Sequence, residues 1–163
     1  MRKSIVTLVA SIACLWALPG VATAQLPTCP PGTTNPGYCE PSPSVKDIVK
    51  TAASAHANAQ DALADEGSID NLVAGSGVSV NAQARATGKH TIKLTVKLGR
   101  KTIVIATGSK AVRKAGKTKI VLSSTKAGRK YLRGRESARL RITTTFDPKV
   151  GRTVRLKGNT KVN

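Results

Sequence analysis

The chain has 163 residues and a formal net charge of +19 at pH 7, and only 2% of its residues are aromatic. This length suits one compact domain, and its core must be built from aliphatic side chains. Histidines and cysteines are few in the whole chain, and residues 81–163 contain only two acidic residues. This composition argues against enzymes that need clustered catalytic or metal-binding groups.

Residues 1–24 have the pattern of a secretory signal peptide. Two cations at 2–3 precede an apolar stretch at 5–18, and Ala22-Thr23-Ala24 offers a small-x-small cleavage site. A transmembrane anchor needs about 18 or more apolar residues, and this stretch is shorter. Cys14 leaves a lipoprotein signal as a further alternative. We expect a secreted or cell-surface protein with no transmembrane segment after cleavage.

Residues 25–43 are rich in Pro, Thr and Gly, which predicts an irregular spacer. Cys29 and Cys39 flank the loop "CPPGTTNPGYC". In an exported chain such a pair indicates a disulfide. Metal binding is the alternative, but no ligand cluster accompanies the two cysteines.

Residues 44–76 are expected to form a helical segment and a hinge. Ser44 has the position of an N-cap, with Asp47 three residues later. Apolar residues then recur at helical spacing over 45–65, and "SIDNLVAGSG" predicts one more helical turn before the hinge. The apolar stripe is thin and rich in Ala, so we expect this amphipathic helix to dock on a surface rather than to build a core.

Residues 77–163 change to a period of two, which is typical of strands. "TKAGRKYL" in this region predicts a single helical turn. Short strands separated by Gly turns indicate an all-β sandwich. The six expected strands are "VSVNAQARA", "KHTIKLTVKL", "TIVIAT", "TKIVLSS", "SARLRITTTF" and "GRTVRLKG".

The stretch "VRKAGKTKIVLSSTKAGRKYLRGRESARLRITTTF" resembles the immunoglobulin-like or fibronectin-III-like modules of secreted actinobacterial proteins. The resemblance covers residues 78–160 and consists of a strand, a "T-x-A-G-R" turn, a basic run and an alternating strand. It implies export and an antiparallel immunoglobulin-like β-sandwich. It brings no catalytic residues with it.

Candidate catalytic groups are few. His90 follows Gly88-Lys89, and we expect it to be exposed at a turn, whereas His56 lies on the stripe of the predicted helix. Glu136 and Asp147 stand at opposite ends of one strand, on the order of 35 Å apart, which is too far for a carboxylate pair. We therefore expect no catalytic, cofactor or metal site, and no enzyme.

Charge is divided along the chain. Residues 25–80 carry two lysines against six acidic residues, whereas residues 81–163 carry 23 Lys and Arg against two acidic residues. Some of the cations lie on outward faces of predicted strands and others crowd one turn. The candidate polyanion-binding residues are Lys93, Lys97, Lys126, Arg129, Lys130, Arg133, Arg135, Arg139 and Arg141.

Three functions are compatible with these cations. The first is a secreted or cell-surface interaction module whose basic face contacts anionic envelope polymers or lipid headgroups. The second is a structural domain without a ligand, in which the cations only solubilise the sheet and protect its edges. The third is a cationic membrane-active factor or one that binds extracellular nucleic acid nonspecifically. The acidic helix could also pack on the basic sheet of its own chain or of another copy, so self-association stays open.

Overall fold

The computed structural model describes residues 42–163. The predicted signal peptide, most of the spacer and the Cys29–Cys39 pair lie outside the described residues. Six strands and three helical stretches are present where the sequence predicts them, so the mainly β class is confirmed. The elements are α1 (Val45–Ala64), α2 (Ser68–Ala74), β1 (Val78–Ala84), β2 (Gly88–Leu98), β3 (Lys101–Val112), β4 (Gly116–Ser124), α3 (Lys126–Leu132), β5 (Ala138–Pro148) and β6 (Val154–Val162).

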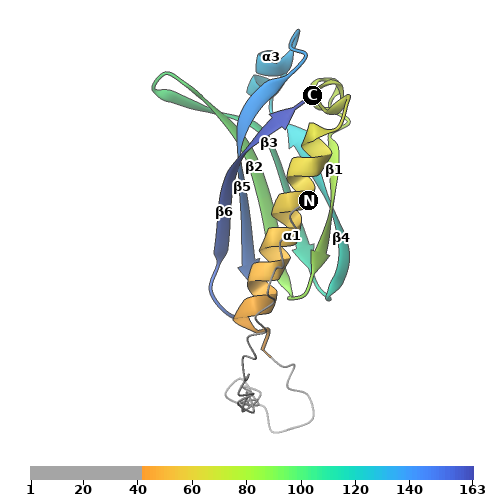
Figure 1. Cartoon of the computed structure of the whole chain (residues 1–163), viewed down its shortest axis with the longest axis vertical. Coiled ribbons are helices and arrows are strands. Elements are labelled where there is room, and N and C mark those ends of the chain that lie inside the picture. Colours follow the sequence, from red (N-terminus) through yellow and green to blue (C-terminus); the bar gives the residue numbers. More distant parts are fainter. Residues whose placement is uncertain (1–41) are drawn as a thin grey trace, which may run out of the picture.

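The strands form one antiparallel sheet in the order β1-β4-β3-β2-β5-β6. The ladder between β3 and β4 is only two residue pairs long, Ala106↔Ser124 and Thr107↔Ser123. The sheet curls around the core (Figure 1). The immunoglobulin-like sandwich is not confirmed, because the six strands belong to one curled sheet.

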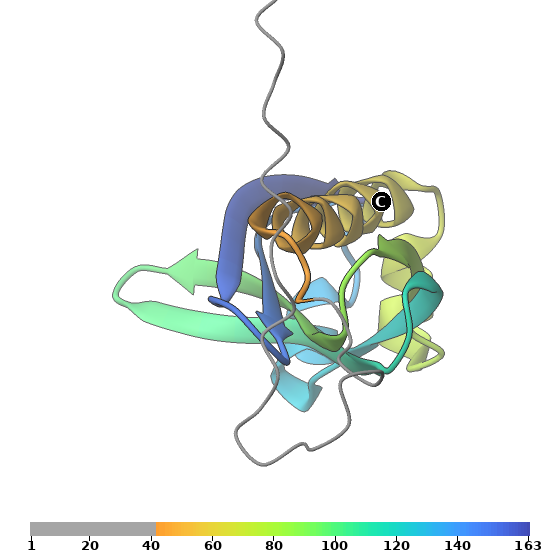
Figure 2. The same cartoon turned by 90° about the horizontal axis from the view of Figure 1, so that it is seen from below.

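Helix α1 lies between the two edge strands, β1 and β6, and contacts both (Figure 2). Its buried face carries Ala52, Ala55, Ala59 and Leu63, each 0% exposed. The expectation that this stripe docks on a surface is wrong, since Ala55, Ala59 and Leu63 belong to the main core together with strand residues. The small Ala side chains let the helix lie close to the strands, and the helix closes the curled sheet.

Polar side chains of α1 bond the free edge of β1. The Thr51 Oγ1 accepts from the backbone N–H of Arg85 at 2.9 Å, and the Ser54 Oγ accepts from the N–H of Gln83 at 3.0 Å. The Asn58 side chain donates to the carbonyl of Asn81. Helix positions three and four residues apart thus meet every second residue of a strand. The helix takes the place of a seventh strand along this edge, which would otherwise be open to pairing with another chain.

Polar side chains on the other side of α1 form hydrogen bonds to β5 and β6. The Gln60 Nε2 donates to the carbonyl of Asn159 at 3.0 Å, and the His56 Nδ1 lies 3.1 Å from the Thr144 Oγ1. Gly158 permits this approach, because a Cβ there would lie 3.0 Å from the His56 Nε2. No ion pair joins α1 to the sheet within residues 43–163. The helix is therefore held by apolar packing and hydrogen bonds rather than by its acidic charge.

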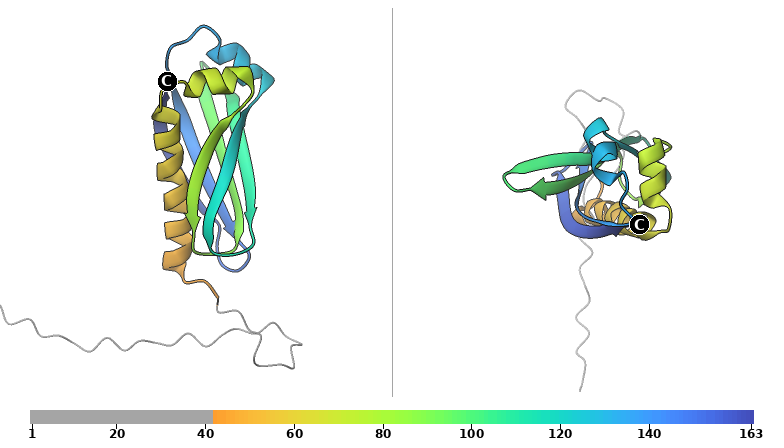
Figure 3. Two further views of the ribbon diagram at one scale, coloured as in Figure 1. Left: turned by 90° about the vertical axis from the view of Figure 1, so that its right-hand side faces the viewer. Right: turned by 90° about the horizontal axis from the view of Figure 1, so that it is seen from above.

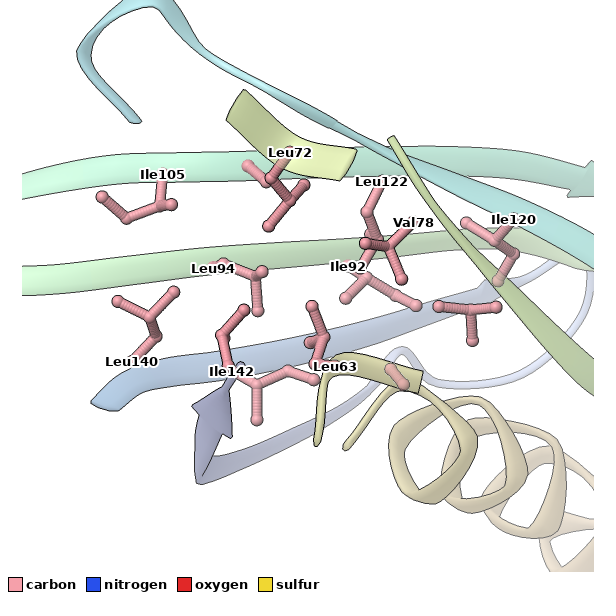
Figure 4. Packing of buried hydrophobic residues seen from close by; sticks show 14 of the residues in the cluster. Leu63, Leu72, Val78, Ile92, Leu94, Ile105, Ile120, Leu122, Leu140 and Ile142 are labelled. Atoms are coloured by element: carbon pink, nitrogen blue, oxygen red, sulfur yellow. The ribbon is translucent and has the colours of Figure 1, made fainter. Parts of the chain in front are cut away.

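Short helices α2 and α3 cover one end of the curled sheet (Figure 3). Leu72 of α2 and Leu132 of α3 are fully buried there. The core beneath them is aliphatic, as the composition requires (Figure 4). Among the described residues, no helix is long and apolar enough to cross a membrane.

Candidate functional site

The outer surface of β2, β5 and β6 is dominated by cations. Side chains alternate across these strands, so the residues between the buried ones face away from the core. We call this surface the basic face. All of its cations are exposed: Lys89, Lys93, Lys97, Arg139, Arg141, Arg155, Lys157 and Lys161.

The register places these cations in a regular array. Arg139 stands directly opposite Lys161, while Lys93 and Lys157 stand on either side of Thr143 in one row across the three strands. Directly opposite side chains have Cβ atoms about 4.5–5.5 Å apart. Successive outward residues on one strand are about 6.6 Å apart. An anionic chain with a similar charge spacing could contact several of these cations at once.

In the part of the chain that the structure describes, few acidic side chains accompany the cations of the basic face. Within the described residues past Ser42, none of its cations forms an ion pair. One acidic residue, Asp147, lies on the same surface, and its Oδ1 accepts a hydrogen bond from the Thr153 hydroxyl at 2.6 Å. Thr143 and Thr145 lie between the cations and bring further hydroxyl donors. The array is thus suited to anions that accept both charged and neutral hydrogen bonds.

A groove of about 620 Å³ hollows one end of the basic face. It lies where the β2–β3 hairpin diverges from β5 and β6 (Figure 1). We call this groove the notch. It is lined by the cations Lys97, Arg139, Arg141 and Lys161, together with Thr95, Val96, Thr102, Leu140, Asn159 and Thr160.

The second predicted group of cations is not part of this surface. Lys126, Arg129 and Lys130 belong to α3, and Arg133 and Arg135 follow it. The Arg129 side chain donates to the carbonyl of Ser124 at 3.2 Å. The Arg135 Nε donates to the carbonyl of Tyr131 at 2.8 Å, and its guanidinium lies 4.5 Å from the centre of that ring. Two of these five cations therefore have structural roles at the end of the sheet.

Four of the nine predicted residues, Lys93, Lys97, Arg139 and Arg141, come together on the basic face. The prediction did not include Lys89, Arg155, Lys157 and Lys161, which complete it. Two of these, Arg155 and Lys157, alternate with Val154 and Leu156, so the same period of two could have identified them. Lys161 lies beyond the predicted end of the last strand, which continues to Val162.

His90 is buried, so the expectation that it lies exposed at a turn is wrong. It is 0% exposed, neither ring nitrogen has a hydrogen-bond partner, and its ring lies 4.6 Å from that of Phe146. Burial lowers the pKa of His90 to about 4, so the side chain is neutral at pH 7. Burial also lowers the pKa of His56. His90 is thus a core residue, and His56 is a contact between α1 and β5.

Among the described residues, no group of three or more His, Cys, Asp or Glu side chains could hold a metal ion. No protein-family model, curated protein or solved structure matches this chain.

Proposed function

We propose that the protein is a non-enzymatic interaction module, secreted or held at the cell surface, whose basic face binds anionic envelope polymers. The observation that carries this proposal is the array of eight exposed cations on three adjacent strands, none of which forms an ion pair within residues 43–163. The proposed location follows from the signal-peptide pattern of residues 1–24 and from the resemblance to secreted immunoglobulin-like modules.

A flexible polymer with regularly spaced phosphate or carboxylate groups fits this surface better than nucleic acid does. Binding would release counterions from the polymer and would weaken as salt rises. Proteins that bind single-stranded nucleic acid usually add aromatic side chains on which bases stack. The outer residues of β2, β5 and β6 include no aromatic side chain.

Co-sedimentation of the full chain with isolated cell-wall material across a salt series tests the proposal. The variant Lys93→Glu/Arg141→Glu/Lys157→Glu reverses one cation on each strand of the basic face. Lys126→Glu/Lys130→Glu/Arg133→Glu changes the net charge by the same amount around α3 and is the matched control. We expect the first variant to bind more weakly at every salt concentration. Its plot of log affinity against log salt concentration should have a slope smaller by about two to three. The control should bind nearly as the native chain does.

Equal losses in the two variants would show that net charge alone governs binding. No binding of the native chain at low salt would mean that the cations serve solubility, and the structural domain without a ligand would take first place.

A further inference from the structure

Strands β2 and β5 separate before either of them ends. The ladder between them stops at Thr95↔Arg141. Beyond this pair, β2 continues along β3 to Leu98, and β5 continues along β6 to Ala138. The β2–β3 hairpin projects away from the body of the sheet (Figures 2 and 3). Residues 96–98 and 138–140 thus present two free strand edges, one on each side of the notch.

The alternation of backbone hydrogen bonds shows which groups face the notch. Gly99 and Arg100 form a two-residue turn, so Leu98 and Lys101 bond each other across the hairpin. The backbone N–H and C=O of Lys97 therefore point away from β3, toward the notch. The Thr107 hydroxyl on β3 donates a hydrogen bond to the carbonyl of Ile92 on β2. This bond supports the same alternation, in which the backbone groups of even-numbered β2 residues point toward β3 and those of odd-numbered residues point away from it.

The same alternation applies to β5. Thr95 has the orientation of Lys97, so Arg141, directly opposite Thr95, directs its backbone groups toward β2. Two residues earlier, Arg139 has this orientation too. No ladder joins Lys97 to Arg139 within residues 42–163. Each side of the notch thus has one N–H and one C=O available to a further strand.

Charged and apolar side chains lie on opposite faces of the sheet at the notch. Lys97, Arg139, Arg141 and Lys161 lie on the outer side. Val96, which lines the notch, lies on the inner side of the hairpin, and Ile103 stands directly opposite it on β3. Both pack against the core and are only partly buried. A strand inserted here would place alternate side chains against cations and against apolar groups.

We propose that the notch binds an extended acidic peptide as an added strand, with acidic residues alternating with apolar ones. The peptide backbone bonds Lys97 and Arg139, the acidic side chains meet the outer cations, and the apolar ones cover Val96 and Ile103. A polyphosphate chain could meet the cations but has no N–H to offer the free carbonyls. A second copy of this chain would add its own cations, so charge complementarity favours an acidic partner.

Two variants of one residue test the backbone contact. Lys97→Ala removes the charge and keeps the N–H, whereas Lys97→Pro removes both. Proline is tolerated at an edge position whose N–H does not pair within the sheet, and equal denaturation midpoints would show that both variants are folded. The probe is a fluorescein-labelled heptapeptide of alternating Glu and Val, measured by fluorescence anisotropy with the full chain. We expect Lys97→Pro to bind it about tenfold more weakly than Lys97→Ala.

A second probe has the same sequence, but alternate backbone amides along one edge of the extended peptide carry N-methyl groups and cannot donate hydrogen bonds. It should lose the binding that the plain heptapeptide shows. Equal affinity of the two peptides, equal affinity of the two Lys97 variants, or no binding of the plain peptide at low salt would overturn the proposal. Binding to inorganic polyphosphate distinguishes the proposed peptide site from the proposed function of the basic face. Retention on polyphosphate should be the same for both Lys97 variants, because they carry the same charge.

Discussion

The Thr51 hydroxyl on α1 connects the helix to the sheet in two directions. It donates to the carbonyl of Asp47 at 2.7 Å, and its oxygen accepts the backbone N–H of Arg85 at 2.9 Å. Thr51 is itself 0% exposed. One side chain thus satisfies a backbone donor just beyond the end of β1 and fixes the helix beside that strand.

Replacing Thr51 with Val keeps the shape of the side chain and removes both hydrogen bonds. We expect Thr51→Val to lower the free energy of unfolding by about 1–3 kcal/mol, because the N–H of Arg85 is left without a partner. Thr51→Ser retains the hydroxyl and should lose less. Urea denaturation of the three chains measures the difference. Equal stability of the native and Val chains would show that water replaces the helix at this edge.

Leu63, in the last turn of α1, tests whether the helix is part of the core. Leu63 is 0% exposed and packs with strand residues, so Leu63→Ala should cost about 2–5 kcal/mol. Leu98, at the tip of the β2–β3 hairpin, is 45% exposed, and Leu98→Ala should cost less than about 0.5 kcal/mol. Similar midpoints for the two variants in chemical denaturation would contradict the position of α1.

The positions of the helices and strands can be predicted from the sequence, because each element is determined by a pattern of nearby residues. The period of two in β5 and the Ser44–Asp47 cap of α1 are examples. The cap forms as expected, with the Ser44 Oγ accepting from the N–H of Asp47 at 3.1 Å. The sequence does not predict the closure of the sheet by α1, because Ala gives a weak apolar signal although its small size permits the close approach. The strand order β1-β4-β3-β2-β5-β6 depends on pairings between distant residues, which alternation alone does not reveal.

The sequence predicts about half of the basic face, because alternation along a strand is local whereas the pairing between strands is not. Alternation placed Arg139 and Arg141 outward, but only the register shows that Arg139 lies opposite Lys161. The preceding Gly88-Lys89 suggests a turn at His90, whereas His90 in fact belongs to strand β2. It has the same parity as Ile92 and Leu94, so the strand period could have identified it as buried.

Gly128 in α3 supports a close contact that a larger residue would disrupt. A Cβ at this position would overlap the backbone carbonyl of Ile105 on β3. We expect Gly128→Ala to lower the free energy of unfolding by about 1–3 kcal/mol, although alanine favours helices in general. Lys130→Ala, at an exposed position of the same helix, is the control and should change the denaturation midpoint little. A Gly128→Ala chain as stable as the native one would show that α3 can move away from β3 without cost.

His90 predicts how stability depends on pH. Its pKa falls from 6.5 in the unfolded chain to about 4 in the folded one, because burial penalises the charged ring. Between these values the unfolded state binds more protons, so the full contribution is present above pH 6.5 and is lost as the pH falls toward 4. The loss is on the order of 3 kcal/mol across this window. Urea midpoints measured at pH 7 and at pH 5 should show a marked decrease.

The variant His90→Leu removes this titration and should show a flatter pH dependence than the native chain. It should also be at least as stable at pH 7, because two ring nitrogens without partners no longer have to be buried. His56 contributes in the same direction, since burial lowers its pKa too. His56→Ala is therefore the matched control and should retain the part due to His90. If the midpoints of His90→Leu fall with pH as steeply as those of the native chain, the buried ring is not the group that titrates.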